Sequence, residues 1–394
     1  MKYDRVTTDA QLAELCDRLS GVPTIAIDTE FVSEHSYRPQ LCLVQVAAAG
    51  RLAVIDTMEL REIAPFWKFL SEGDHQTVVH AGREEVGFSL TSIGVPQANL
   101  FDLQVAAGLI GLEYPAGYSS LVQKLLGQTP QKGETRTDWR KRPLSDRQLQ
   151  YALTDVIYLE PMRDRIRERL QRLGRTAWMD TEMTAWLDDV VAGYRRDRWR
   201  RTSGISGLSA RAKALVREIW QWRESEAERR DIPVRRVLRD DLIVELAKRQ
   251  SDDVDVIRNI RGLERGDLKH ALPKIAEAVR RGLDLPESEL PRGRPPRDLP
   301  PQLNLLGQFL SSALGSICRQ YDLAASLVGG PNDVRELVAY RLGMTLSDDP
   351  VPALAEGWRA EVVGSLIDDL LSGKTAIRIS NPKSDQPLKF ETRE

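Results

Sequence analysis

The stretch TIAIDTEFVSE, residues 24–34, decides the fold because it combines a buried-strand pattern with two closely spaced acids. Asp28 and Glu30 are two residues apart, so on a β-strand their side chains project from the same face. If Ile25 and Ile27 face the core, the two carboxylates lie together on the opposite face. Like charges at that spacing repel, and a cation held between them is the usual remedy. The pair therefore indicates a metal site, although two acids considered alone also fit a solvated strand end.

The composition describes an ordinary soluble globular chain. Its 394 residues are 41% hydrophobic and 29% charged, which is enough for two or three domains with their own cores. The formal net charge is −2, so a polyanionic partner has to be met by local basic patches. Cys16, Cys42 and Cys318 form no CxxC pair, which argues against a disulfide framework or structural zinc and predicts a cytoplasmic location.

The chain shows no signal for a membrane or a secretory route. Its first residues read as a domain start with a helix rather than as a signal peptide. No run of about 18 apolar residues is present, so no membrane span is expected. A G-x-x-x-x-G-K-[ST] phosphate loop is also absent from the sequence, which argues against a helicase and predicts no nucleotide cofactor.

Residues 1–175 alternate strand and helix signals and predict an α/β domain. Three apolar runs separated by short turns predict an antiparallel meander, and two further runs predict more strands. The expected strands cover residues 24–31, 41–48, 51–57, 75–82 and 99–104. Apolar residues then recur at intervals of three and four from 147 to 170, which predicts continuous helix.

The rest of the chain reads as helical blocks separated by connectors. Residues 176–207 contain YRRDRWRRTSGISG and predict a basic connector. Residues 208–285 form an all-helical block, and residues 286–302 are too rich in proline for helix or strand and predict a linker. Residues 303–394 form a second helical block that ends in a short extended tail.

Downstream groups complete the chemistry that Asp28 and Glu30 suggest. Glu85 follows a strand end in VVHAGREEVGFSL, while Tyr151 and Asp155 in YALTDVIYL share one helix face at i, i+4 spacing. Two-metal phosphodiester hydrolysis uses such acids to hold two divalent ions about 4 Å apart. Hard oxygen ligands favour Mg²⁺ or Mn²⁺ over zinc, and a phenol beside the attacking water can orient it.

These motifs resemble those of the bacterial ribonuclease D group, the tyrosine subclass of the DEDD exonucleases. The matching pieces are the D-x-E strand with Asp28 and Glu30, the Y-x-x-x-D helix with Tyr151 and Asp155, the stretch DWRKRPL at 138–144, and HAG at 80–82. The resemblance implies a ribonuclease H-like domain with a mixed sheet flanked by helices, followed by all-α domains. It also implies two divalent ions and stepwise 3′ to 5′ removal of nucleoside 5′-monophosphates from RNA.

The resemblance assigns a role to each group of the site. Asp28 bridges both ions, Glu30 and Asp155 complete the site of the water-activating ion, and Tyr151 orients the water. The family's second motif normally has an aspartate where this chain has Glu85, and that acid serves the second ion. Because a misplacement of about 1 Å can cost on the order of a hundredfold in rate, this substitution opens the alternative of a weakened enzyme. Neighbouring Glu84 is expected to face solvent.

Four further residues near these motifs have competing interpretations. His80 is a candidate substrate contact or a structural histidine with satisfied hydrogen bonds. Asp102 is a candidate supporting acid, but helix capping is the plainer expectation. Trp139 and Arg142 either brace the helix that carries Tyr151, which is the favoured reading, or touch the nucleic-acid backbone.

Basic segments supply the candidate contacts to nucleic acid. Arg195, Arg196 and Trp199 lie in a run of arginines and aromatics that suits phosphate contacts and base stacking. The block at 208–285 resembles the HRDC domain, and its candidate phosphate contacts are Arg229, Arg230, Arg235 and Arg236. Solvated surface charge is the competing explanation for both sets. The resemblance also suggests a second HRDC-like domain at 303–394.

Together these features predict a cytoplasmic, metal-dependent 3′ to 5′ exoribonuclease whose partner is RNA with a free 3′ end, with transfer RNA precursors as a candidate substrate. No obligate protein partner is expected. One rival is a DNA exonuclease, because the same active site cleaves either polymer. The other rival is an RNA-binding protein whose nuclease site has decayed through the change at Glu85.

Overall fold

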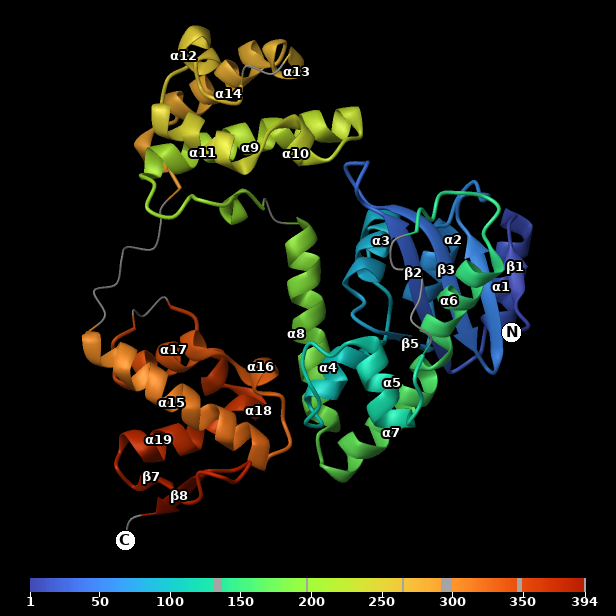
Figure 1. The fold of residues 1–394 in the computed structure, drawn as a ribbon, viewed down its shortest axis with the longest axis vertical. Helices are drawn as coiled ribbons and strands as arrows, with labels where there is room; N and C mark the ends of the chain where they lie inside the picture. The colour runs from blue at the N-terminus through green and yellow to red at the C-terminus, as the bar shows by residue number, and fades with distance from the viewer. Residues whose placement is uncertain (131–136, 196–197, 264–265, 292–299, 346–348, 393–394) are drawn as a thin grey trace.

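The computed structural model describes residues 1–130, 137–195, 198–263, 266–291, 300–345 and 349–392, which form three parts in chain order. An α/β domain comes first, a helical domain follows it, and a C-terminal domain lies on the far side of helix α8 (Figure 1). No helix within these described ranges has the length and apolar character that a membrane crossing requires.

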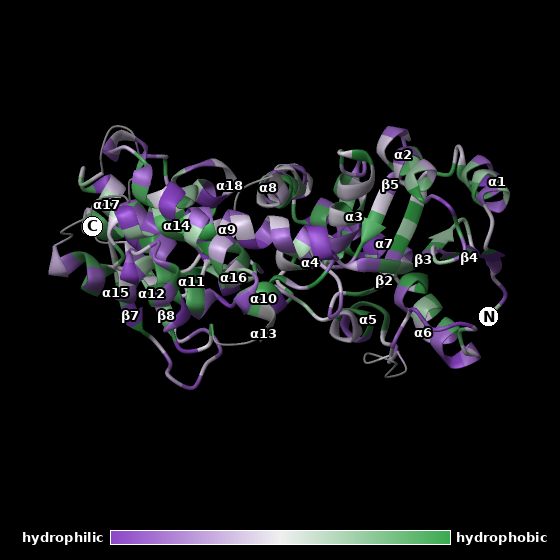
Figure 2. Cartoon of the chain, turned by 90° about the horizontal axis from the view of Figure 1, so that it is seen from above, coloured by the Kyte–Doolittle hydropathy of each residue, from purple (hydrophilic) through white to green (hydrophobic). Residues whose placement is uncertain are grey.

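A mixed six-stranded sheet forms the centre of the α/β domain, in the order β1-β4-β3-β2-β5-β6. β2, β3 and β4 pair in antiparallel fashion, whereas β1, β5 and β6 run parallel to their neighbours. The strands are β1 Asp4–Val6, β2 Thr24–Val32, β3 Gln40–Ala48, β4 Arg51–Asp56, β5 Gln76–Val79 and β6 Leu100–Asp102. The predicted meander is confirmed, and β1, which the sequence reading missed, adds a short edge strand. Hydrophobic residues predominate in the central strands (Figure 2).

Helices cover both faces of this sheet, as the predicted fold class requires (Figure 1). They are α1 Asp9–Leu19, α2 Ala64–Glu72, α3 Arg83–Ile93, α4 Leu103–Gly108, α5 Tyr118–Leu126, α6 Asp146–Ile157, α7 Leu159–Arg172 and α8 Thr176–Arg195. The continuous helix expected from 147 to 170 breaks at Tyr158. Pro161 supplies the reason, because it has no N–H to donate to the carbonyl of Ile157 and its ring crowds that carbonyl.

The first twenty residues of the expected connector form helix α8, so the connector prediction is wrong there. Residues 176–195 are helical, and Met179, Met183 and Val190 are buried in the core of the α/β domain. Their spacing of four and seven residues is the pattern of a helix with one apolar face. The arginines at the end of the segment, rather than this stripe, produced the connector interpretation.

The first helical domain has a core of its own and contacts the α/β domain through a loop. Its elements are η1 Arg198–Arg201, α9 Ala210–Arg230, α10 Val234–Val237, α11 Asp240–Arg249, α12 Val254–Arg258, α13 Gly266–Lys269 and α14 Leu272–Asp284. Tyr37, between β2 and β3, packs against this core and donates its backbone N–H to Asp231 at 3.1 Å. The Tyr37 hydroxyl lies 3.2 Å from Glu224, and Arg38 pairs with Glu228 at 2.9 Å.

The C-terminal domain packs directly on the α/β domain, and the two share one hydrophobic core. It contains α15 Pro301–Gln320, α16 Ala325–Val328, α17 Pro331–Arg341, η3 Ala353–Ala355, α18 Gly357–Arg359, η4 Ala360–Gly364, α19 Ser365–Leu371, β7 Thr375–Ile379 and β8 Leu388–Thr392. Arg359 forms two contacts with buried Glu182, at 2.7 and 2.8 Å, and Trp358 stacks on Trp178. The expected extended tail is one strand of the β7–β8 hairpin, so this domain is not purely helical.

Candidate active site

Strand β2 places the first two acids beside each other at the centre of the sheet. Asp28 is paired with Gln45 of β3, and Glu30 with Leu43, so both carboxylates leave the same face. Ile25 and Ile27 are fully buried, as the alternation predicts. The β2–β3 register shifts between Glu30 and Phe31, directly after the second acid.

Helix α6 brings the third acid to this face of β2. Ser145 and Gln148 form a capping box that fixes where α6 begins. Its buried face, with Leu149, Ala152 and Leu153, packs against Val32 and Cys42 of the neighbouring strands, and Asp155 follows two residues after Leu153. One oxygen from each of Asp28, Glu30 and Asp155 lies within 4.8 Å of the other two.

Burial raises the pKa of all three carboxyl groups, and the charges of neighbouring acids raise it further for Asp28 and Glu30. Burial raises the pKa of Glu30 to about 8, with the charges of Asp155 and Glu85 adding to the effect. The pKa of Asp155 rises to about 6 through burial, and the pKa of Asp28 rises well above its usual range for the same reason and through Glu85, Asp155 and Glu30. In the described ranges, no basic side chain is among the causes that shift these three pKa values, and three crowded carboxylates form a donor set that fits a hard divalent cation.

Glu85 lies beside this trio without belonging to the group of three. It sits in the first turn of α3 and is 5% exposed, and its Oε1 accepts a hydrogen bond from the Thr29 hydroxyl at 2.6 Å. Its charge is the largest single Coulombic contribution to the raised pKa of Asp28, and burial raises its own pKa to about 7. Glu84 is half-buried rather than solvent-facing, and it forms a hydrogen bond with Tyr194.

Asp102 fixes the start of the helix that carries Glu85. It is the N-cap of α4, where its Oδ1 accepts the backbone N–H groups of Gln104 and Val105 at 2.7 and 3.4 Å. Its Oδ2 accepts the N–H of Gly82, the N-cap of α3, at 2.7 Å. The capping expectation is confirmed, and the second bond explains why a buried acid stands at this position.

His80 directs one ring nitrogen into the protein. Its Nε2 lies 2.9 Å from the carbonyl oxygen of Ala116, and its ring meets the ring of Tyr118 edge-on at 5.7 Å. The Tyr118 hydroxyl in turn donates to the carbonyl of Thr154, the residue before Asp155. This geometry supports a structural role for His80. A contact between His80 and the substrate stays a prediction.

Tyr151 stands one helical turn from Asp155 and forms a hydrogen bond with it. Burial and the nearby acids raise the pKa of the phenol, so the hydroxyl is protonated at neutral pH. The buried Trp139 stacks on the Tyr151 ring, with centroids 6.2 Å apart and planes at 29°. Trp139 therefore braces the tyrosine by packing, as expected.

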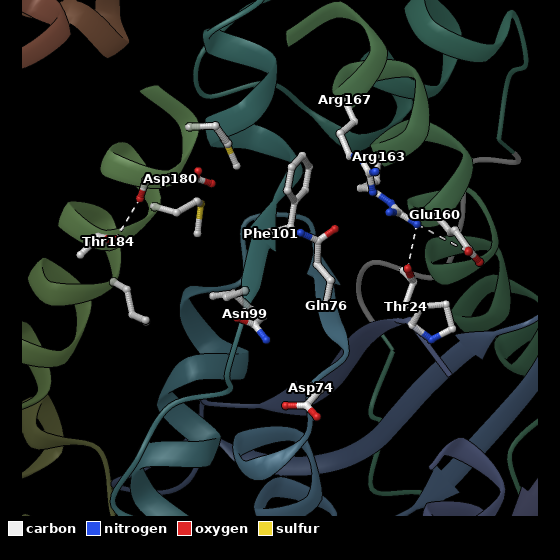
Figure 3. Close-up of a pocket in the computed structure, with 15 residues that line it drawn as sticks. Thr24, Asp74, Gln76, Asn99, Phe101, Glu160, Arg163, Arg167, Asp180 and Thr184 are labelled. Carbon is white, nitrogen blue, oxygen red and sulfur yellow. Dashed lines mark hydrogen bonds and ion pairs between the residues drawn. The ribbon is translucent and has the colours of Figure 1, made fainter. Parts of the chain in front are cut away.

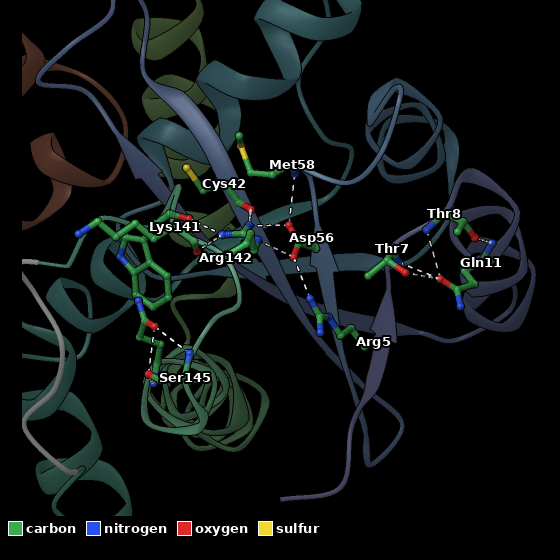
Figure 4. A network of polar contacts seen from close by, with 12 residues as sticks. Arg5, Thr7, Thr8, Gln11, Cys42, Asp56, Met58, Lys141, Arg142 and Ser145 are labelled. Atoms are coloured by element: carbon green, nitrogen blue, oxygen red, sulfur yellow. Dashed lines mark hydrogen bonds and ion pairs between the residues drawn. The ribbon is translucent and has the colours of Figure 1, made fainter.

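Arg142 is engaged by the protein through every one of its donor nitrogens (Figure 4). Its Nε and Nη2 contact both oxygens of Asp56, at 2.7 and 2.5 Å, and Nη2 also donates to the carbonyl of Cys42. Nη1 donates to the carbonyls of Trp139 and Lys141. The bracing alternative fits this geometry, and a contact of Arg142 with nucleic acid does not, because the guanidinium has no donor left to offer.

The candidate nucleic-acid contacts of the first helical domain differ in how far they are exposed and in whether they are paired with an acid. Trp199 is 5% exposed within that domain's core, so the prediction that it stacks on bases is wrong for this conformation. Arg229 and Arg230 are paired with Glu226, at 2.6 and 4.0 Å, and Arg229 remains 64% exposed.

The remaining basic candidates stay predictions. Arg235 and Arg236 are exposed on α10. Arg195 ends α8, and Arg196 lies outside the described residues.

Sequence reasoning missed three residues that support the site. Asp56, Thr29 and Tyr118 contact Arg142, Glu85 and the α6 backbone respectively. A polar residue at a strand end or within a buried strand is the only sequence signal for Asp56 and Thr29, and their partners are distant in the chain. Tyr118 carries no such signal.

Two of the three domains match known family models. Residues 3–171 match the 3′-5′ exonuclease family model, and residues 212–279 match the HRDC domain model. The ribonuclease D of Gluconacetobacter diazotrophicus is 33% identical over 96% of this chain and 95% of its own length. The ribonuclease D of Acidiphilium cryptum is 35% identical over 94% of this chain and 93% of its own length. The chain belongs to the ribonuclease D family.

A solved structure supports the same assignment over most of the chain. The crystal structure of Escherichia coli RNase D, described as an exoribonuclease involved in structured RNA processing, superposes with a TM-score of 0.80 at 27% identity. It covers 95% of this chain and 99% of its own. As a family member with this exonuclease domain, the chain is a 3′-5′ exoribonuclease, and the rival readings as a DNA exonuclease or a decayed nuclease are not favoured.

Proposed function

We propose that Asp28, Glu30, Glu85 and Asp155 hold two divalent metal ions, Mg²⁺ or Mn²⁺, at which the chain hydrolyses the terminal phosphodiester of an RNA 3′ end. The observation that carries the proposal is the convergence of Asp28, Glu30 and Asp155, whose oxygens lie within 4.8 Å of one another. Bound divalent ions supply Lewis acidity, which activates water and stabilises the leaving oxygen in hydrolysis of this type.

The protein's own residues hold and orient the reactants. The charges of Glu85, Asp155 and Glu30 all act on Asp28, so Asp28 would serve both ions, with Glu30 and Asp155 as its partners at one ion and Glu85 at the other. The Tyr151 hydroxyl, protonated at neutral pH, is placed to orient the attacking water by hydrogen bonding. Trp139 and Arg142 keep α6 in position, so the chemistry depends on positioning and electrostatics.

Glu85 suits this role despite its extra methylene. The Thr29 hydroxyl fixes its carboxylate at 2.6 Å, so the longer side chain has a defined position rather than free rotation. Among the neighbouring acids, Glu85 raises the pKa of Asp28 most, which supports a place for Glu85 beside the same metal cluster. The proposal is therefore that glutamate replaces the family's aspartate with retention of activity.

The substrate and compartment belong to the same proposal. The free cysteines Cys16, Cys42 and Cys318 support a reducing compartment, the cytoplasm. The HRDC domain, a nucleic-acid-binding module, presents exposed arginines on α10 that support a grip on structured RNA, with transfer RNA precursors as the candidate class.

Digestion of RNA labelled at either end tests the proposal. With Mn²⁺, 5′-labelled RNA is expected to shorten in single-nucleotide steps, and 3′-labelled RNA is expected to release labelled mononucleotide at once. Asp28→Ala is expected to abolish both signals, whereas Asp17→Ala, an exposed acid on α1, is expected to behave as wild type. A matched DNA strand serves as a substrate control. Undiminished shortening by a folded Asp28→Ala protein would refute the assignment.

A further inference from the structure

Helix α8 meets the nuclease differently along its length. Its first half faces a cavity of about 670 Å³ that is also lined by residues of α7 and β6, and Asp180 and Thr184 of α8 lie at this cavity (Figure 3). The end of α8 instead lies against α3, the helix that carries Glu85. The second half of α8 therefore supplies contacts that can fix α3.

Tyr194, in the last turn of α8, approaches α3 so closely that only glycine fits opposite it. A Cβ atom placed on Gly87 would lie 1.9 Å from the Tyr194 hydroxyl oxygen and 2.4 Å from the ring carbon that bears it. Both distances are far shorter than a van der Waals contact. A glycine inside a helix lowers its stability relative to alanine. The space that Tyr194 occupies explains why α3 carries one here.

The same hydroxyl donates a hydrogen bond to Glu84. Glu84 and Gly87 are three residues apart, so they are neighbours on one face of α3. Glu85 lies between them in sequence, and its carboxylate accepts the bond from Thr29 of β2 at 2.6 Å. Tyr194 thus holds one face of the helical turn from which Glu85 reaches β2.

A second contact joins the same two helices but is open to solvent. Arg83 of α3 lies 3.4 Å from Asp189 of α8, and the two side chains are 46% and 66% exposed. Exposed pairs of this kind contribute little to stability, because water and salt screen them. Tyr194 is therefore the contact expected to decide where α3 lies against α8.

Arg198, from the first helical domain, supports Tyr194. Its guanidinium lies over the Tyr194 ring, 5.4 Å from the centroid, and its Nε donates to the carbonyl of Gly193 at 3.0 Å. The next residue, Trp199, is buried in the core of that domain. Tyr194 therefore contacts both the helix that carries Glu85 and a residue anchored in the first helical domain.

We propose that Tyr194 is a positioning residue for Glu85, which it serves by fixing α3 against α8, and that Arg198 supports it in this role. The inference rests on the proposed function, in which Glu85 serves the second metal ion. Without Tyr194 the first turns of α3 lose the contact on one face, and a displacement of about 1 Å is enough to misplace a reacting group.

Hydrogen exchange of the full chain in EDTA tests whether Tyr194 holds α3, because no metal is then bound. Tyr194→Ala is expected to speed exchange of the α3 amides about tenfold. Tyr194→Phe keeps the ring but loses the bond to Glu84, and it is expected to speed exchange about threefold. Arg198→Ala, which removes the cation over the ring, is expected to have a similar effect of about threefold.

Gly87→Ala gives a double-mutant test of the same contact. Alone, it is expected to speed exchange of α3 about as much as Tyr194→Ala does, because the added methyl group displaces the tyrosine. Combined with Tyr194→Ala it is expected to add no further loss, since the clash is gone and alanine favours the helix. Tyr340→Ala is the matched control. Tyr340 is 36% exposed, against 37% for Tyr194, and Arg341 lies over its ring at 5.7 Å.

Titration with Mn²⁺, followed by electron paramagnetic resonance of the free ion, tests whether this hold on α3 serves the metal site. The wild-type chain is expected to bind two ions. Tyr194→Ala is expected to weaken one of them about tenfold and to leave the other, held by Asp28, Glu30 and Asp155, unchanged. A purely structural role would lower stability without distinguishing the two ions. Tyr340→Ala is expected to bind both as wild type does.

Three results would overturn the proposal. They are unchanged exchange of α3 in Tyr194→Ala, unchanged binding of both ions by that variant, and an effect of Gly87→Ala that adds in full to that of Tyr194→Ala. A wild-type chain that binds fewer than two ions would instead contradict the two-ion site of the proposed function. The exchange of α3 in EDTA would then still decide whether Tyr194 holds this helix.

Discussion

Replacement of Arg142 by methionine tests whether this residue braces the catalytic helix or touches RNA. Its side chain is 17% exposed, and its partner Asp56 is 1% exposed. Loss of one partner from a buried ion pair costs about 3–5 kcal/mol, because the remaining charge stays buried. Arg5 also approaches Asp56, at 3.4 Å, and compensates in part. We therefore expect the opening free energy of the segment 139–157 to fall by about 3 kcal/mol.

Hydrogen exchange followed by mass spectrometry measures this effect locally, without requiring two-state unfolding of a multidomain chain. Amides of α6 are expected to exchange roughly a hundredfold faster in Arg142→Met, since about 1.4 kcal/mol corresponds to a factor of ten. Arg5→Met is the matched control, because Arg5 is 47% exposed and its pair is worth about 0.5 kcal/mol. Unchanged exchange in α6, together with weaker RNA binding by Arg142→Met, would refute the bracing role.

Three further predictions address the acids and the domain contact. In single-turnover RNA shortening, Glu85→Asp is expected to keep activity within about tenfold of wild type. Glu85→Gln keeps the contact with Thr29 but removes the charge, and it is expected to lose about a hundredfold in the same assay. Burial raises the pKa of Glu30 to about 8, so between about pH 4.5 and pH 8 the folded, metal-free protein binds more protons than the unfolded chain. Its melting temperature in EDTA is therefore expected to fall as the pH rises through this range, and added Mg²⁺ is expected to restore it most at the upper end. A melting temperature that does not change with pH would contradict the crowding of the acids. Arg38→Ala combined with Tyr37→Phe is expected to enlarge the radius of gyration in X-ray scattering, because it removes two of the contacts to the first helical domain; an unchanged radius would mean that other contacts hold the domains together.

The sequence predicts the parts of the site in which two residues lie on the same strand or helix. Asp28 and Glu30 share a strand face, and Tyr151 and Asp155 share a helix face, so local periodicity alone places each pair correctly. The contacts between Arg142 and Asp56, and between Glu85 and Thr29, join residues 86 and 56 positions apart, and no local pattern encodes them. The same limit explains α8, whose apolar stripe has meaning only once a partner surface exists.

The two later domains are attached to the nuclease by contacts of different strength. At the interface with the C-terminal domain, Glu182 of α8 and Trp358 of the C-terminal domain are both buried. Arg175 of the nuclease donates to the carbonyls of Tyr321 and Asp322. These contacts continue the nuclease core, so this domain moves with the catalytic sheet.

Against the first helical domain, the Arg38–Glu228 pair is 57% exposed on both sides, and exposed pairs contribute about 0–1 kcal/mol. The loop that carries Tyr37 begins directly after β2, and Tyr37 lies seven residues after Glu30. The contact with the HRDC domain therefore lies close to the end of the strand that carries Asp28 and Glu30, whereas the C-terminal domain is joined to α8 through the shared core. The HRDC domain is therefore attached through a few polar, partly exposed contacts, and the C-terminal domain through a buried core.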